Sequence, residues 1–311
     1  MQNMKRYRHG IMGTVCVPWN EDCGFAEELF RWQARHLVRN GIRDLYVFGT
    51  AGEGYAVTET QFDRITRVFL DETARPGVQS LIGIISLSLP TVIERIERAR
   101  AMGATRFQIS LPGWGALDDV ELDTFFRETC GRFSDCEFMH YNLGRSRRVL
   151  MPAEYARLAE RHPNLVATKN SSQDAGFVGE LLKAAPQLQH FLTETGFGHG
   201  GLVGECSLLI SVASVQPGLA ARYARAAVER DAATLTSMQS ELRNLIADLI
   251  ELVGGSAHMD GAYDKMFCKL HDRRFPLRLL PPYAGVSENV FEKFVELLRT
   301  KYPRWLPKPG A

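Results

Sequence analysis

The chain has 311 residues, of which 45% are hydrophobic and 23% charged, as expected for a globular protein with a large core. Its formal net charge is +1, from 37 basic and 36 acidic residues, so nucleic acid is not an expected partner. No run of about 18 apolar residues occurs, and the N-terminus lacks the apolar region of a signal peptide. The six Cys are scattered without metal or redox spacing. We therefore expect a cytoplasmic protein with reduced thiols and no membrane contact.

Short apolar runs with β-strand character alternate with longer amphipathic runs. The β-type runs lie near residue 10 and at 44–49, 80–85, 106–110, 137–142, 165–170, 189–194 and 208–214. Between them apolar residues recur at helical intervals, as in residues 25–41, where Gly41 follows the last turn. Strand followed by helix, repeated eight times, predicts an α/β fold of the parallel (β/α)8 TIM-barrel type rather than an open sheet.

The strand pattern stops after about residue 230. Three segments with helical periodicity follow, at 235–254, 261–272 and 288–302, with a Pro-rich connection before the last. The sequence therefore predicts a catalytic barrel over residues 1–230 and a C-terminal helical extension over residues 231–311.

Catalytic groups of such barrels project from the carboxyl ends of the strands. The polar candidates there are Thr50 to Glu53 after the second strand, Tyr141 and Asn142 in the fifth, and Lys169 in the sixth. Because all parallel strands end on the same side of the barrel, these groups are expected to meet at one mouth.

Lys169 follows the apolar residues 165–167, where a charged ammonium would be costly. Desolvation would lower the pKa of the amine and make it a nucleophile for a carbonyl carbon. The alternative is a Lys at a strand end that forms a salt bridge with a loop acid. Tyr141 could move protons beside Lys169, or it could be a rim aromatic with a hydrogen-bonded hydroxyl.

The turn from Thr50 to Gly52 is flanked by glycine and precedes a helix, so its backbone N–H groups could bind a carboxylate. A purely structural turn is the alternative.

Two histidines lie near these segments. His140 should point away from Tyr141, toward the helices, because side chains alternate along a strand. His199 lies in a Gly-rich stretch, GFGHGG, which we expect to be flexible.

Together, GTAGEG at 49, YN at 141 and TKNSS at 168 resemble the dihydrodipicolinate synthase and N-acetylneuraminate lyase family of class I aldolases. That family carries G-[TS]-T-G-E, then Y-N, then a Schiff-base Lys 28 residues after the Tyr, and Tyr141 and Lys169 have this separation. The opening GTVCVPWNED and the segment LISVASVQP also resemble the family, so the resemblance spans nearly the whole chain.

The resemblance implies a catalytic set of Lys169, Tyr141 and Thr50. Lys169 would form the imine, Tyr141 would transfer protons, and Thr50 would supply a hydroxyl to that Tyr. The turn that includes Ala51 and Gly52 would bind the carboxylate of pyruvate through its backbone, and Ile210 would line the pyruvate pocket. Glu53 is expected to brace the turn. No metal and no cofactor are expected, because the imine serves as the electron sink.

Three departures from the family pattern concern the second substrate. Ala51 replaces the second Thr of the turn. Trp114 stands where the synthases have a relay Tyr from a neighbouring subunit, and an indole cannot relay protons as a phenol does. Ser146 stands at the position of the Arg that binds the aldehyde substrate's carboxylate. Our hypothesis is that Arg145 or Arg147 reaches the same space and grips an anionic distal group, although a short basic run also occurs in solvated loops.

The resemblance implies a Schiff-base-forming lyase that acts on a 2-keto acid such as pyruvate, as aldolase or dehydratase of a 2-keto-3-deoxy sugar acid or similar compound. Two alternatives stay open. One is a 4-hydroxy-tetrahydrodipicolinate synthase, which condenses pyruvate with aspartate semialdehyde. The other is a non-catalytic ligand-binding paralogue, suggested by the departures. Because members of the family assemble as dimers of dimers, a homotetramer is expected.

Overall fold

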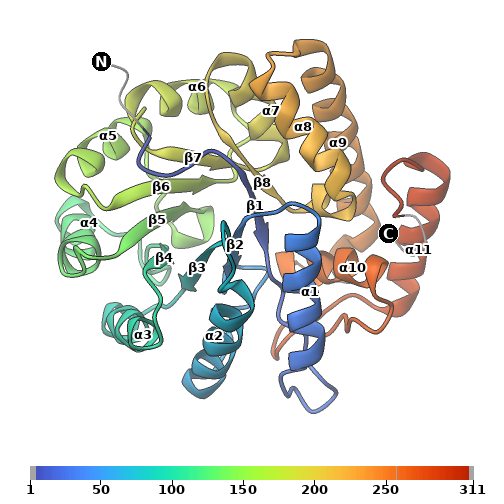
Figure 1. Ribbon diagram of the computed structural model, residues 1–311, viewed down its shortest axis with the longest axis horizontal. Helices are drawn as coiled ribbons and strands as arrows, with labels where there is room; N and C mark the ends of the chain where they lie inside the picture. The colour runs from blue at the N-terminus through green and yellow to red at the C-terminus, as the bar shows by residue number, and fades with distance from the viewer. Residues whose placement is uncertain (1–4, 257, 308–311) are drawn as a thin grey trace.

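The computed structural model describes residues 5–256 and 258–307, and its strands form a closed parallel barrel (Figure 1). The strands are β1 (Ile11–Thr14), β2 (Asp44–Val47), β3 (Gln79–Ile84), β4 (Arg106–Ile109), β5 (Glu137–Asn142), β6 (Leu165–Asn170), β7 (Gln189–Leu192) and β8 (Ser207–Ile210). Each strand pairs with the next one along the chain, and β8 closes the barrel on β1, with Gly13 opposite Ile210. The predicted TIM barrel is confirmed.

Helices surround the barrel. They are α1 (Glu27–Arg39), α2 (Glu59–Thr73), α3 (Leu89–Ala101), α4 (Asp119–Phe126), α5 (Pro152–Arg161), α6 (Ala175–Ala184), α7 (Glu194–Val203), α8 (Pro217–Val228), α9 (Ala232–Val253), α10 (Asp260–His271) and α11 (Glu288–Lys301). Helix α9 packs on α7 and α8, whereas α10 lies against the 3-10 turn Val212–Val215 that follows β8. Helix α10 thus sits beside the end of the last strand, whereas α11 packs on α9 at the outer edge of the molecule (Figure 1).

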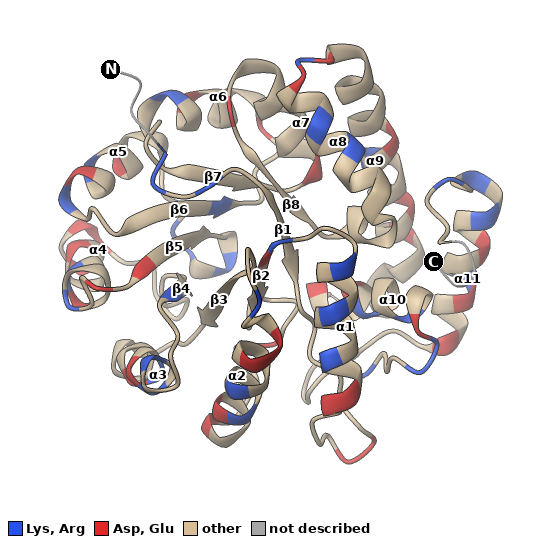
Figure 2. Cartoon of the chain, in the orientation of Figure 1, with Lys and Arg blue, Asp and Glu red and all other residues tan. Residues whose placement is uncertain are grey.

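Below the carboxyl ends of the strands, the interior of the barrel is filled by buried side chains from several strands. Met12, Leu81, Met139, Phe191 and Leu209 are members of one buried cluster there. Figure 2 shows that charged residues gather on the outer helices and that the strands are mostly uncharged. A lysine in β6 therefore rests on a closed apolar layer instead of a water-filled channel.

The segment GFGHGG, which we expected to be a flexible stretch, is instead part of helix α7. The expectation was wrong because the glycines allow this helix to pack closely against its neighbours. A Cβ on Gly201 would lie 2.8 Å from the Cβ of Ala227, and one on Gly198 would lie 2.5 Å from the hydroxyl of Tyr223.

The last predicted strand is also shorter than expected, since β8 ends at Ile210. Within the described ranges, no helix is long and apolar enough to cross a bilayer.

Candidate active site

A cavity of about 960 Å³ opens at the carboxyl ends of the strands. Its inner wall includes Thr14, Tyr46, Tyr141, Lys169 and Ile210, which are contributed by five different strands. Its outer wall comes from the loops after β5 to β8 and from helices α9 and α10. The cavity thus occupies the place where barrels of this type carry their reactive groups.

Lys169 lies at the inner end of the cavity and is only 3% exposed. Its Nζ donates a hydrogen bond to the hydroxyl of Tyr46 at 2.6 Å and lies 3.8 Å from the centroid of the Tyr141 ring. Burial lowers the pKa of the amine to about 7, although the charge of Asp260 acts in the opposite direction. A large share of the amine is therefore unprotonated at neutral pH, as a nucleophile requires.

The strand pairing places Tyr141 beside Lys169. The two residues are register partners on β5 and β6, and the next pair in register is Asn142 with Asn170. The Nδ2 of Asn142 donates to Oδ1 of Asn170 at 3.0 Å and to the carbonyl oxygen of Leu150. Because side chains alternate along a strand, the reactive pair faces the interior while the two amides fasten the strand ends on the other side.

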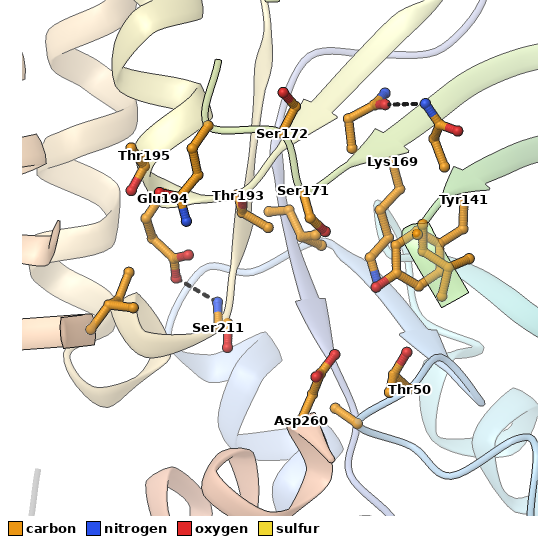
Figure 3. Close-up of a pocket in the computed structure, with 18 of the residues that line it drawn as sticks. Thr50, Tyr141, Lys169, Ser171, Ser172, Thr193, Glu194, Thr195, Ser211 and Asp260 are labelled. Atoms are coloured by element: carbon orange, nitrogen blue, oxygen red, sulfur yellow. Dashed lines mark hydrogen bonds between the residues drawn. The ribbon is translucent and has the colours of Figure 1, made fainter. Parts of the chain in front are cut away.

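Tyr141 is surrounded by groups that could exchange protons with it. Burial and the nearby Asp260 raise the pKa of the phenol, whereas hydrogen bonds with Thr50 and Ser171 act to lower it. Figure 3 shows Thr50 and Ser171 close to the Lys169–Tyr141 pair. The structure therefore brings together the three predicted catalytic residues, Lys169, Tyr141 and Thr50.

The turn after β2 has a conformation that its sequence explains. Thr50 and Ala51 line the cavity. Gly52 lies behind them, and a Cβ there would come within 2.6 Å of the backbone nitrogen of Phe48, so only glycine fits. Glu53 has a φ of 55°, which is unusual for a residue with a side chain. Its buried position must hold that strained backbone in place.

Glu53 is held by three donors, as expected for a residue that braces the turn. Its carboxylate accepts from Trp19 Nε1 at 2.8 Å, from the backbone nitrogen of Leu280 at 2.7 Å and from Lys265 Nζ at 2.5 Å. Both charged side chains of the Glu53–Lys265 pair are fully buried. This ion pair joins the turn after β2 to helix α10.

Sequence reasoning missed several residues of the cavity. Tyr46 is the third residue of β2, and the prediction considered only residues at the strand ends. The alternation of side chains along β2 could have indicated that Tyr46 points into the barrel. Asp260, Tyr263 and Asp264 reach the cavity from α10. The hydroxyl of Ser211 donates to Asp264 at 2.8 Å, and burial raises the pKa of Asp264 to about 8. No pattern in the sequence indicated where this helix would dock.

The other predicted binding residues take different positions. Ile210 and Arg145 line the cavity, and Arg145 forms a 3.2 Å ion pair with Asp260. Arg147 is exposed, and its Nε donates to the carbonyl oxygen of Gly113 at 3.1 Å. Trp114 is 83% exposed on the loop after β4. Neither Arg147 nor Trp114 is among the residues that line the cavity.

His140 points toward the helices as expected, because its Nδ1 lies 2.7 Å from the hydroxyl of Tyr155 in α5. Burial lowers the pKa of this imidazole to about 3. His140 is therefore neutral at physiological pH and lies outside the cavity lining.

The sequence profile of the dihydrodipicolinate synthetase family matches residues 8–300. An uncharacterized DapA-like lyase of Halobacterium salinarum is 26% identical over 243 residues, 78% of this chain and 79% of the relative. A 4-hydroxy-tetrahydrodipicolinate synthase of Prochlorococcus marinus is 30% identical over 222 residues, 70% of this chain and 72% of the relative.

Solved structures show the same fold. YagE, a prophage protein of the dihydrodipicolinic acid synthase family from E. coli K12 in complex with pyruvate, superposes with a TM-score of 0.83 at 19% identity, and 94% of this chain and 97% of that one are covered. The dihydrodipicolinate synthase of Aquifex aeolicus has a TM-score of 0.83 at 18% identity, with coverage of 97% and 100%.

Proposed function

Because the chain belongs to the dihydrodipicolinate synthetase family, whose members are lyases, we propose that it forms a Schiff base between Lys169 and a 2-keto acid such as pyruvate. The observation that carries this proposal is the state of one amine. Lys169 is buried at the inner end of the cavity, its pKa is lowered to about 7, and its Nζ lies against the ring of Tyr141.

In the proposed reaction, neutral Nζ of Lys169 attacks C2 of the keto acid, and the carbonyl oxygen takes a proton. Loss of that oxygen as water leaves a protonated imine, which draws electrons from the C3–C4 bond or from a C3–H bond. Tyr141 is placed to carry the protons because its phenol lies beside the amine and exchanges hydrogen bonds with Thr50 and Ser171. Tyr46 accepts a hydrogen bond from Nζ and so orients the amine.

The carboxylate of the keto acid requires donors near Lys169. The turn that contains Thr50 and Ala51 supplies this wall of the cavity, with Gly52 allowing the backbone to approach β1 and β2. Ile210 supplies an apolar contact on the opposite side of β1. We therefore retain these residues as the binding site for the keto-acid end. The proposal assigns no contact with substrate to Arg147 or Trp114.

Reduction by borohydride in the presence of pyruvate tests the proposal. A Schiff base is reduced to a stable secondary amine, so the intact protein should gain one pyruvate-derived adduct, and peptide mass spectrometry should place it on Lys169. Lys169→Ala should form no adduct, whereas Lys183→Ala, which removes an ordinary lysine in the last turn of α6, should behave like the wild type. An adduct that persisted in Lys169→Ala, or none in the wild type, would refute the assignment.

The same experiment addresses the ligand-binding paralogue, which would retain pyruvate without forming an adduct. In the absence of borohydride, a 4-hydroxy-tetrahydrodipicolinate synthase would condense the enamine formed from pyruvate with aspartate semialdehyde. The chain's relatives include enzymes of that name, but here Ser146 is buried and Arg145 is paired with Asp260. These positions favour another acceptor, such as the aldehyde released from a 2-keto-3-deoxy sugar acid.

We also propose that the enzyme is a homotetramer in the cytoplasm. Trp114, which is 83% exposed, stands where the family resemblance places a relay Tyr that enters a neighbouring subunit, and this position supports self-association. Sedimentation of the wild type beside Trp114→Ser would test this part, and a monomeric wild type would overturn it.

A further inference from the structure

The cavity has an unusual balance of charge beyond Lys169. Its lining carboxyl groups are Asp174, Glu180, Glu194, Asp260 and Asp264, whereas its lining cations are Lys169 and Arg145. Since Lys169 has a pKa of about 7, Arg145 is the one cation in the described lining that stays fully charged. Within the described lining, Arg145 is therefore the one charged group that could form an ion pair with a carboxylate at the far end of a substrate at every physiological pH.

Arg145 is already engaged by Asp260. Its guanidinium lies 3.2 Å from Oδ1 of Asp260 and also donates to the carbonyl oxygen of His258. The same Oδ1 accepts a hydrogen bond from the hydroxyl of Tyr263 at 3.1 Å, so the position of Asp260 is fixed from two sides. Figure 3 shows Asp260 directed from below toward Thr50 and the Lys169–Tyr141 pair.

The acidic groups deeper in the cavity are also satisfied within the protein. Oε1 of Glu194 accepts from the backbone nitrogens of Ser211 at 2.7 Å and Ala213 at 3.0 Å. Asp264 accepts from the hydroxyl of Ser211, and burial favours its neutral form. Among the described residues of this deeper wall, the acidic groups of Glu194 and Asp264 are thus already engaged, and no cation is free to pair with a carboxylate there.

The remaining polar groups of the wall are neutral. Ser171 and Ser172 follow β6, Thr193 follows β7 and Ser211 follows β8, and all four line the cavity. Figure 3 shows Thr193 and Ser211 on the side of Lys169 away from Tyr141. Hydroxyl side chains both donate and accept hydrogen bonds, so they match hydroxyl groups on a ligand.

We propose that Asp260 determines specificity by holding Arg145 away from the substrate, so that the subsite beyond Lys169 accepts an uncharged, hydroxylated group and disfavours a second carboxylate. The inference rests on the proposed Schiff-base function. A distal carboxylate would have to displace Asp260 from Arg145 and would then lie beside a second negative charge. Exposed ion pairs are weak, and we therefore expect a preference of about tenfold rather than complete exclusion.

Two ligands of equal chain length test the proposal. In 4,5-dihydroxy-2-ketopentanoate the fifth carbon is a hydroxymethyl group, and in 4-hydroxy-2-ketoglutarate it is a carboxylate. The measurement is the concentration of each compound that gives half-maximal borohydride trapping on Lys169, which needs no later step of the reaction. The dihydroxy compound should reach half-saturation at about one tenth of the concentration. Equal values, or preference for the diacid, would overturn the proposal.

Variants identify the residue responsible. Asp260→Asn should release Arg145 and reduce the preference to about threefold or less, chiefly by improving the diacid. Glu180→Gln removes a carboxylate from the exposed rim of the same cavity without touching Arg145, and it should keep the wild-type ratio. All of these measurements should be made at a pH about two units above the Lys169 pKa. At that pH a change in the Lys169 pKa no longer alters the fraction of the amine that is neutral. A ratio unaffected by Asp260→Asn would exclude Asp260.

Arg145→Gln separates the proposal from its rival, in which Arg145 itself binds a distal carboxylate. The rival predicts selective loss of the diacid, and such a loss would contradict our assignment. Trapping of pyruvate, which has no distal group, tests the underlying function independently. Failure with pyruvate would reject the Schiff-base function, whereas normal trapping of pyruvate without the preference would reject only the role of Asp260.

Discussion

Tyr141 and Lys169 are register partners on adjacent parallel strands, and the Nζ of Lys169 lies 3.8 Å from the centroid of the Tyr141 ring. Their separation of 28 residues is the length of one strand-helix unit measured between equivalent positions. The 28-residue spacing therefore reflects a direct contact between neighbouring strands β5 and β6. Strand pairing alone brings the phenol ring of Tyr141 against the amine of Lys169, and no loop is needed to position either group.

The rate of borohydride-dependent trapping by pyruvate should rise with pH through about 7, because the neutral amine is the reactive form and burial lowers the Lys169 pKa to that value. Asp260 raises this pKa through its negative charge, so Asp260→Asn should shift the midpoint to lower pH. Stopped-time trapping at a series of pH values would measure both midpoints. A wild-type midpoint near that of ordinary lysine would show that the amine is not desolvated.

Tyr141→Phe should lower turnover of the best substrate by roughly 100- to 10,000-fold, the usual range for loss of a general acid-base group. It should still allow slow formation of the pyruvate adduct, because Lys169 remains buried. Tyr46→Phe is the matched variant, since both phenols contact the same amine. It removes an orienting hydrogen bond only, and steady-state kinetics should show a smaller loss. An equal loss in both variants would contradict the separate roles.

Glu53→Gln should destabilise the protein by about 3–5 kcal/mol, because it leaves Lys265 charged and buried without its partner. Chemical denaturation would measure the change. Glu292→Gln breaks an exposed ion pair with Arg273 and should cost less than about 1 kcal/mol. The double variant Glu53→Leu with Lys265→Met should be more stable than the sum of the single changes predicts, and strict additivity would speak against a direct coupling.

Asp264→Asn tests the neutral state of that carboxyl. Burial raises the folded-state pKa of Asp264 to about 8, so the folded protein retains a proton that the unfolded chain releases near pH 4. Wild-type stability from this group therefore falls as pH rises from about 4 to about 8, and the variant lacks this term. The melting temperature of Asp264→Asn relative to wild type should rise over that interval. A constant difference would mean that Asp264 is ionised in the folded state.

The barrel and its reactive pair could be predicted because both depend on local patterns. Alternation of short apolar runs with helical periods indicated the fold, polar residues at strand ends made Lys169 and Tyr141 candidates, and the family resemblance selected them as the reactive pair. Tyr46 lies inside a strand and its environment depends on the neighbouring strands. Asp260 and Asp264 depend on where α10 docks, which is decided by tertiary contacts such as the Glu53–Lys265 pair.

The Gly-rich segment of α7 illustrates the same limit. Glycine disfavours an isolated helix, so GFGHGG suggested a flexible segment. In the folded protein the absent side chains make room for Tyr223, Ala227 and Leu235, and helix formation follows from packing. Intrinsic preference was overridden by contacts that come from residues far along the chain.

The amide bridge between Asn142 and Asn170 has a consequence for how this enzyme could change during evolution. It anchors the strands that carry the reactive phenol and amine, while the wall that faces them comes from a separate helix. Substitutions on α10 can therefore change which compounds are accepted, while the strand pairing that holds Tyr141 against Lys169 is kept. Because the reactive groups lie on strands and the facing wall comes from a helix, the two can change independently in sequence. This is a simple physical route by which one barrel can acquire many substrates.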